Sequence, residues 1–323
     1  MFTRVRRVSC CALAVAAVAL LTSSCSGPAS GSSGTISITV GVLPVIDDVS
    51  VYMAQNDGIF AKNGLSVKLQ QVLKSTAAIP MMQHGSLDII GGGNYVSFIQ
   101  QSAGDPANPP FRVLAEAATC SSGSFDVMAL PSSHIQTPAD LQHKTIAVNL
   151  TNNIQTLMIN SVLKADGVST KSVHYVSVAF PKMVAELESH QVDAISVLEP
   201  FLTTAEQAAG AQPILDQCSG PDSNLPLSGY FSTGTWAQKN PEAVRRFQAA
   251  IAQAQEIADT DRAEVEKTLL TYVKGLTPVQ AATIALEQFP TSVDSVQLNR
   301  VSDLMREAGL IHGSIQASSL ING

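Results

Sequence analysis

Residues 85–94 read GSLDIIGGGN, and residues 190–199, 105 positions later, read HQVDAISVLE. In each stretch an aspartate precedes a short apolar run of the kind that forms buried strands. Residues 91–94 close the first run, and residues 198–200 close the second. This repeat predicts that the chain contains two halves built on one plan.

The sequence around both stretches repeats with nearly the same offset. Gly64 and Gly167 lie 103 positions apart, and each follows a helical segment where a left-handed C-cap favours glycine. Asp88 and Asp193 could be proposed as catalytic acids, but their equivalence in the two halves favours a structural role in a helix–turn–strand unit. The strand-like runs lie at residues 36–42, 66–72 and 87–90 in the first half, and at 145–148, 173–178 and 192–197 in the second.

Strands that alternate with helices predict an α/β fold with a mostly parallel sheet in each half. Right-handed crossovers then place the strand-to-helix loops at one edge of each sheet, so two lobes flanked by helices are expected. Strand-like runs at residues 125–130 and 230–235 predict a two-strand hinge between the lobes, and the helical pattern of residues 241–309 predicts helices packed on the first lobe. The expected domains are lobe 1 at residues 35–125 and 230–323 and lobe 2 at residues 126–229.

The N-terminal 24 residues have the pattern of a secretory signal peptide. A short basic start is followed by an apolar run that is too short to span a membrane, which takes roughly 20 residues. Leu21-Thr22-Ser23-Ser24-Cys25 resembles a bacterial lipobox, although Thr22 stands where that pattern prefers Leu. We therefore expect a lipid anchor on Cys25, a flexible tether at residues 25–34 and an extracytoplasmic protein; ordinary secretion with Cys25 incidental is the alternative. An extracytoplasmic location excludes reactions fed by cytosolic ATP or nicotinamide pools.

Cys120 and Cys218 are the cysteines that remain after the signal peptide and Cys25. A single pair in an oxidising compartment predicts a disulfide, and both residues come shortly before the expected hinge strands. Two buried free thiols are the alternative.

The formal net charge of −7 and the absence of long Lys/Arg runs in the mature sequence argue against nucleic acid as a partner. The sequence has no HExxH, no GxSxG and no Walker loop, and its six His residues form no i,i+4 pair. Gly91-Gly92-Gly93 lacks the third glycine of a dinucleotide loop, because Val96 stands in its place, and we interpret it as a close approach of backbone to a ligand. No metal, no cofactor and no enzymatic activity are expected; an exported hydrolase is the least favoured alternative.

Five segments carry a resemblance to a known family. AQNDGIFAKNGLSVKLQQV, GSLDIIGG, PADLQHKTIAV, ESHQVDAISVLEPF and KNPEAVRRF occur in this order between residues 54 and 247. They resemble the nitrate/sulfonate/taurine and thiamine-precursor group of periplasmic binding proteins. The resemblance implies a two-lobed type II periplasmic-binding-protein fold, a monomer, and delivery of a small solute to the permease subunits of an ABC importer. A solute-sensing lipoprotein without a transport role is an alternative.

The same resemblance implies a ligand held between the lobes by loops that follow the strands. No Arg lies in these loops, so a bare nitrate is disfavoured, whereas a taurine-like zwitterion or another sulfonate, or alternatively an aminopyrimidine thiamine precursor, fits. The implied contacts are Pro44, Asp47, Asp48, Lys74, Ser75, Thr76, Gly93, Asn94, Tyr95, Thr151, Asn152, Asn153, Phe180 and Glu199.

Overall fold

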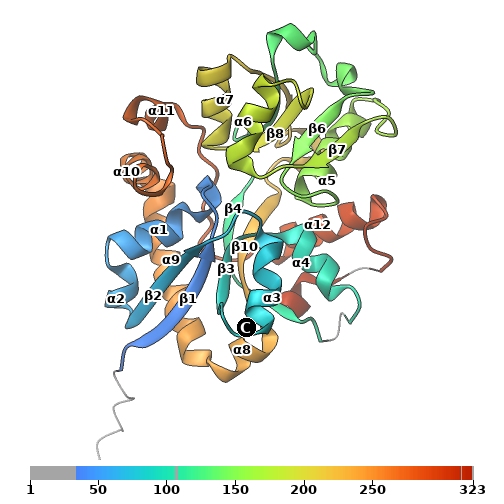
Figure 1. The fold of residues 1–323 in the computed structure, drawn as a ribbon. Coiled ribbons are helices and arrows are strands. Elements are labelled where there is room, and N and C mark those ends of the chain that lie inside the picture. The colour runs from blue at the N-terminus through green and yellow to red at the C-terminus, as the bar shows by residue number, and fades with distance from the viewer. Residues whose placement is uncertain (1–33, 106–107, 314, 322–323) are drawn as a thin grey trace, which may run out of the picture. The chain divides into compact units, whose positions relative to one another are not determined.

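Two five-stranded sheets form the framework of the protein (Figure 1). The computed structural model describes residues 34–105, 108–313 and 315–321. The first sheet has the order β2-β1-β3-β10-β4 and comprises β1 (Ile36–Val42), β2 (Leu65–Gln71), β3 (Ile89–Asn94), β4 (Phe111–Thr119) and β10 (Pro226–Thr233). The second sheet has the order β7-β6-β8-β5-β9 and comprises β5 (Phe125–Ala129), β6 (Thr145–Val148), β7 (His174–Ser177), β8 (Ala194–Leu198) and β9 (Gln212–Asp216).

The two aspartates of the repeat play the same structural role in the two sheets. The Asp88 carboxylate accepts a hydrogen bond from the Thr39 backbone N–H at 2.7 Å, and the Asp193 carboxylate accepts one from the Thr145 N–H at 2.8 Å. The backbone N–H of each aspartate donates back to the carbonyl of the same threonine. Each aspartate therefore joins the start of its own strand to the neighbouring parallel strand, β1 or β6, by hydrogen bonds. These contacts confirm the structural interpretation of both residues.

The glycine prediction is also confirmed, because Gly64 and Gly167 both have φ = +72°. An L side chain rarely adopts this left-handed conformation, so glycine ends both helical segments without strain.

Each sheet is mixed. In the first sheet β1 pairs in parallel with β2 and β3, whereas β10 runs antiparallel to β3 and β4. In the second sheet β6 pairs in parallel with β7 and β8, whereas β5 runs antiparallel to β8 and β9. The hinge strands expected at residues 125–130 and 230–235 correspond to β5 and to β10, which begins four residues earlier than expected. Each of them pairs within one sheet, so the chain crosses between the sheets just before them and not along them. β4 and β9 were absent from the sequence prediction, because neither belongs to the repeating strand–helix pattern.

The chain crosses between the sheets in two segments, residues 120–124 and 217–225. A disulfide joins Cys120 in the first segment to Cys218 in the second, with their Cα atoms 5.4 Å apart. The Cys120 N–H also donates to the Leu225 carbonyl at 2.9 Å. The disulfide expected from the sequence therefore lies where the two connections run side by side.

Helices cover both faces of each sheet (Figure 1). On the first sheet, α1 and α9 pack against each other and against the apolar face formed by β1 and β10. α10 follows α9 in the sequence and packs on α1 and α11. The helices are α1 (Val49–Asn56), α2 (Ile59–Lys62), α3 (Ala78–Gln83), α4 (Tyr95–Ser102), α5 (Ile154–Ala165), α6 (Phe180–Glu188), α7 (Phe201–Ala209), α8 (Gly234–Lys239), α9 (Pro241–Thr260), α10 (Arg262–Tyr272), α11 (Pro278–Thr283), α12 (Ser295–Glu307) and α13 (Ala317–Leu320).

In the described residues no helix combines the length and the apolar character that a membrane crossing requires. The expected signal peptide, the expected lipid attachment site at Cys25 and nearly all of the expected tether lie outside the described residues.

Candidate functional site

A cavity of about 40 Å³ lies where the carboxyl ends of strands from both sheets meet. Loops that follow parallel strands gather at one sheet edge, which is where α/β folds place their ligands. The lining residues are Leu43, Val45, Asp47, Ser75, Gly92, Asn94, Phe125, Asn149, Asn153, Ile154, Gln155, Phe180, Leu198, Leu227 and Ser228.

Five residues expected from the sequence line this cavity. Asp47, Ser75 and Asn94 come from the loops and strand ends of the first sheet, and Asn153 and Phe180 come from those of the second. The structure thus brings together residues that are up to 133 positions apart in the chain.

Five other expected residues do not line the cavity. Thr151 and Asn152 are exposed, Thr76 is half-buried, and Pro44 is buried outside the lining. Lys74 directs its ammonium group to the Ser177 hydroxyl at 2.7 Å.

The remaining four expected residues serve the packing around the cavity. Asp48 is buried and accepts a hydrogen bond from the Leu43 N–H at 2.6 Å. Tyr95 is buried and contacts the ring of Phe231 edge-on. Residue 93 is glycine because a Cβ there would collide with the same Phe231 ring.

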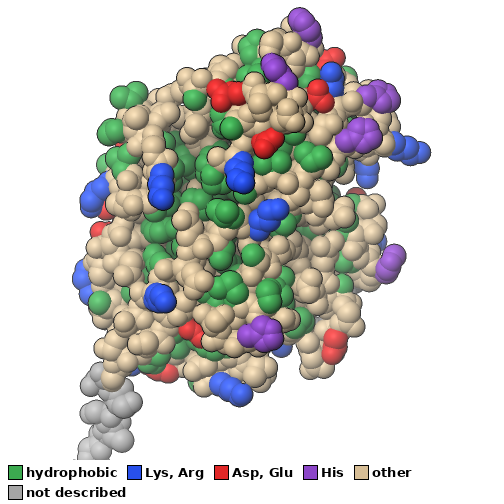
Figure 2. Space-filling model, in the orientation of Figure 1, with side chains coloured by type: hydrophobic (Ala, Val, Ile, Leu, Met, Phe, Trp, Pro, Cys, Tyr) green, Lys and Arg blue, Asp and Glu red, His purple; other side chains and the backbone are tan. Residues whose placement is uncertain are grey.

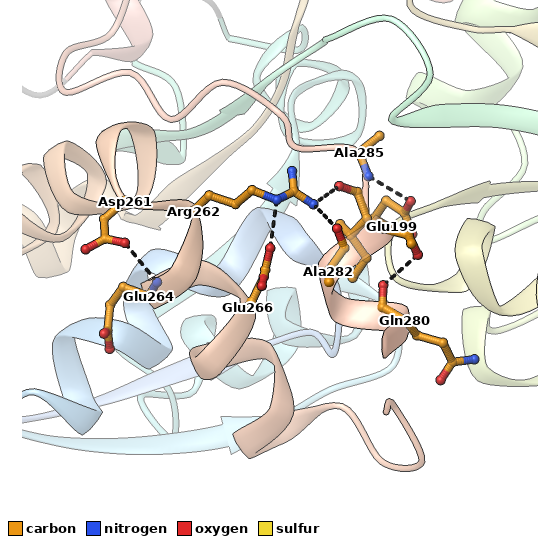
Figure 3. A network of polar contacts seen from close by, with 10 residues as sticks. Glu199, Asp261, Arg262, Glu264, Glu266, Gln280, Ala282 and Ala285 are labelled. Carbon is orange, nitrogen blue, oxygen red and sulfur yellow. Dashed lines mark hydrogen bonds and ion pairs between the residues drawn. The ribbon is translucent and has the colours of Figure 1, made fainter. Parts of the chain in front are cut away.

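Glu199 fastens two separate segments instead of facing the cavity. Its carboxylate accepts hydrogen bonds from the Thr203 N–H and hydroxyl and from the Ala285 N–H at 3.1 Å. Figure 3 shows Glu199 and Arg262 on either side of the C-terminal end of α11, where Arg262 donates to the Ala282 carbonyl at 2.9 Å and to the Ile284 carbonyl at 2.7 Å. The carboxylate is therefore engaged within the protein.

The triple glycine leaves space beside β3 for the Asp48 carboxylate and for aromatic rings. A Cβ at Gly91 or Gly92 would meet the Asp48 carboxylate, and Gly92 has φ = +57°. The close approach expected from the sequence is mainly an approach to protein side chains, although Gly92 itself lines the cavity. These glycines lie within β3, whereas the sequence placed them after the strand.

The first wall of the cavity is built around Asp47 and Asn94. Asp47 lies in the 3-10 turn that follows β1, and one of its oxygens accepts a hydrogen bond from the Ser228 hydroxyl. Asn94 ends β3 and caps α4 by accepting from the Ser97 N–H at 2.9 Å, while its amide group donates to the Ser75 oxygen at 3.2 Å. The cap fixes the Asn94 side chain, which in turn positions Ser75.

The second wall is organised by the N-terminus of α5. Asn153 caps this helix by accepting from the Gln155 N–H at 3.1 Å. The side chain of Gln155 then accepts from the Asn149 N–H at 2.7 Å and donates to the Ser196 carbonyl at 2.8 Å. Because Ser196 bonds in turn to Gln217 at 3.1 Å, this wall is a connected polar network.

Acidic groups dominate the electrostatics near the cavity. Burial raises the pKa of Asp47 to about 6, although the Ser228 hydrogen bond opposes the shift. Burial also raises the pKa of Glu199 to about 7 and that of Glu287 well above its usual range, and the Asp47 and Glu199 charges add to the Glu287 shift. Among the described residues that line the cavity, none is Lys, Arg or His. On the face shown in Figure 2, Lys and Arg side chains are scattered over the outer surface.

Sequence reasoning missed several lining residues. Ser228 lies at the start of β10, a strand that runs against the repeat, so the loop-by-loop comparison did not reach it. Phe125 similarly begins β5. Gln155 was the residue that could have been found, since it lies two positions after the predicted Asn153 at the start of a helix.

Three comparable protein structures share this fold. The alkanesulfonate-binding protein SsuA from Xanthomonas axonopodis pv. citri, bound to MOPS, is 18% identical with a TM-score of 0.73, over 90% of this chain and 99% of that one. The periplasmic nitrate-binding protein NrtA from Synechocystis PCC 6803 is 15% identical with a TM-score of 0.67, over 81% and 73% of the two chains. The desulfurization enzyme DSZB is 16% identical with a TM-score of 0.63, over 88% and 96%.

These similarities show a two-lobed periplasmic-binding-protein fold, which binding proteins and an enzyme share. A comparison with curated protein sequences gives no match. A family model described as NMT1/THI5 like matches residues 47–264, a segment that begins at Asp47 and contains most of the lining residues. The chain therefore belongs to the NMT1/THI5-like family.

Proposed function

We propose that this protein is the extracytoplasmic solute-binding component of an ABC importer, anchored to the membrane by lipid on Cys25. The observation that carries the proposal is the cavity, which is lined from both sheets by residues at their equivalent carboxyl ends. A small solute held there contacts both lobes at once, so its binding favours the closed arrangement by mass action. The anchor keeps the protein close to the permease to which it delivers the solute.

Binding without chemical conversion is the simplest use of this site. The fold alone does not distinguish binding from catalysis, because the desulfurization enzyme DSZB shares it. The described lining residues contain hydroxyl groups at Ser75 and Ser228, and these bond to Asn94 and Asp47. Neither contact supplies a histidine or lysine base for a serine nucleophile. The solutes that the family and the fold suggest are sulfonates, taurine-like zwitterions and aminopyrimidines.

The moving units in this proposal are the two sheets with their helices, residues 35–119 with 226–321 and residues 125–216; the bounds expected from the sequence, 125/126 and 229/230, would divide β5 and β10. They meet through hydrogen bonds that join the two sheets' loops, such as that from the Asn149 amide group to the Leu73 carbonyl at 3.1 Å. Opening requires these contacts to break, and closing around a solute restores them.

A ligand screen on residues 35–323 tests the proposal. Thermal shifts with taurine, alkanesulfonates, nitrate and aminopyrimidines identify a ligand, and small-angle scattering with and without it measures closure. We expect a rise in melting temperature together with a smaller radius of gyration, and unchanged compound by mass spectrometry after incubation. Turnover of the bound compound, or no shift with any of these solutes, contradicts the proposal.

A further inference from the structure

Asp47 presents an unused hydrogen-bond acceptor at the cavity. Its side chain is only 5% exposed and lines the cavity. One carboxylate oxygen accepts from the Ser228 hydroxyl, whereas the other, Oδ1, is buried and has no hydrogen-bond partner among the described residues. A buried carboxylate oxygen without a donor is costly, so this oxygen is suited to a donor that arrives with a ligand.

The surroundings of Asp47 supply acidic groups. Asp48 precedes α1, Glu199 follows β8, and Glu287 lies between α11 and α12, and electrostatic repulsion couples Asp47 to both Asp48 and Glu287. Both Glu287 carboxylate oxygens are also buried without a described partner. The nearby aromatic hydroxyls are those of Tyr230 and Tyr272, and the latter donates to the Val45 carbonyl at 2.9 Å. This wall therefore repels an anion and attracts a cation or a strong neutral donor.

The opposite wall has few donors to spare for an anion. The Gln155 amide group donates to both the carbonyl and the hydroxyl of Ser196, at 2.8 and 2.9 Å. The amide groups of Asn149 and Asn153 donate to the Leu73 carbonyl and to the Gln155 side chain. Apolar contact comes from Phe180, which is stacked on Phe201, and from Phe125.

We propose that the ligand is a small organic solute that carries an amino or ammonium group, which donates a hydrogen bond to Asp47 Oδ1 while the rest of the ligand lies against Phe125 and Phe180. The inference rests on the proposed function and specifies its ligand class. An ammonium or amidine-like N–H forms a charge-assisted bond with the carboxylate and offsets the repulsion among the buried acids. A simple anion such as nitrate or an unsubstituted alkanesulfonate lacks this contact.

Matched solute pairs test the inference on the unmodified protein. Taurine and ethanesulfonate differ by one amino group, as do 4-amino-5-hydroxymethyl-2-methylpyrimidine and its 4-deamino analogue. Calorimetric titration of residues 35–323 is expected to give at least about ten-fold tighter binding for the aminated member of the pair that binds. Equal binding within a pair, or binding of amine-free members alone, overturns the inference and leaves the solute-binding function standing; binding of no member overturns both.

Asp47→Asn separates the carboxylate charge from the shape of the site. This variant is expected to weaken the aminated solute about ten-fold or more and to leave the affinity of its amine-free partner within about two-fold. Asp216→Asn, which changes a carboxylate outside the cavity lining, is the matched control, and far-ultraviolet circular dichroism verifies that each variant folds. Equal losses for both members of a pair overturn the inference, since they indicate a general defect of the site.

Discussion

Asp47 illustrates how burial changes an ordinary residue. In the sequence it is one of two adjacent acids after a strand, and in the structure it is a nearly enclosed carboxylate whose pKa rises to about 6. Asp126, in β5, has its pKa raised to about 7 by burial and by the charges of Asp216, Glu206 and Glu199. At a pH between the unfolded and folded pKa values, such residues bind a proton more readily in the folded protein than in the unfolded chain.

The first prediction concerns the pH dependence of stability. Because the folded pKa of Asp47, about 6, exceeds its usual value of 3.8, the folded state binds more protons than the unfolded state between these values. The contribution to stability is complete below pH 3.8 and is lost as the pH rises through about 6. Urea denaturation of the ligand-free protein should give a smaller free energy of unfolding at pH 8 than at pH 5.

Asp47→Asn is the control for this prediction. It should reduce the difference between the two pH values by about 1.4 kcal/mol, because pH 5 lies about one unit below the folded pKa of about 6 and each unit corresponds to about 1.4 kcal/mol. Glu307→Gln, which alters an exposed carboxylate at the end of α12, should leave the difference unchanged. A wild-type protein that is more stable at pH 8 would show that these carboxylates are not protonated in the fold.

At the scale of elements, the positions of the parallel strands are fixed by contacts that both halves share. β6 is fixed to its neighbours by the same aspartate-to-backbone contacts as β1, and the cavity lies beyond the carboxyl ends of both strands. The connections between the sheets lack such a repeat and are held by the bond between Cys120 and Cys218. Packing and covalent linkage thus act in different parts of the molecule.

The second prediction concerns this covalent link. The disulfide closes a loop with a sequence separation of 98 residues, so its removal should cost about 4–5 kcal/mol in the chain-entropy model. Cys120→Ser combined with Cys218→Ser should lower the melting temperature markedly and leave ligand affinity nearly intact, because neither residue lines the cavity. Calorimetric melting and titration measure the two effects. An unchanged melting temperature would show that the bond does not form in the secreted protein.

Local pattern explains which parts of the fold and site were predictable from the sequence. β1 and β6 were predicted at their observed bounds, because apolar runs bounded by turns identify buried strands. β4 and β9 were missed, since their pairing depends on strands far away in the chain. The same distinction applies to the site. Asn153 was predictable because local sequence indicates a helix cap, whereas Ser228 was not, because its place depends on a partner 181 positions away.

Glu199 shows the corresponding limit for chemistry. An acidic side chain directly after a strand suggested contact with a ligand. Its carboxylate instead accepts a hydrogen bond from the Ala285 N–H, which belongs to the segment after α11. Local sequence indicates which loop carries a residue, whereas distant packing decides which way its side chain turns.

At the scale of the whole molecule, the structure has polar contacts across the cavity region. Lys74, in the loop after β2, reaches Ser177 at the end of β7 at 2.7 Å. The Ile46 N–H donates to the Glu199 carbonyl at 3.1 Å. These contacts join loops of the first sheet to loops of the second, so the proposed opening of the lobes would break them.

The third prediction concerns Lys74. Lys74→Ala should speed ligand dissociation about two- to ten-fold, because a contact specific to the closed lobes is lost while the cavity lining stays intact. Lys68→Ala, on the exposed side of β2, is the control and should leave the rate unchanged. Stopped-flow measurement with the solute identified in the screen gives the rates. Equal rates for wild type and Lys74→Ala would mean that the contact does not hold the lobes together.

The disulfide between the two inter-sheet connections also limits how the two halves can move relative to each other. Two connections joined by a covalent bond at one point can rotate together about that point, but neither can slide along the other. The disulfide therefore fixes this pivot whether or not a ligand is bound. A reduced chain would keep the residues that line the cavity and lose the point about which the two halves rotate.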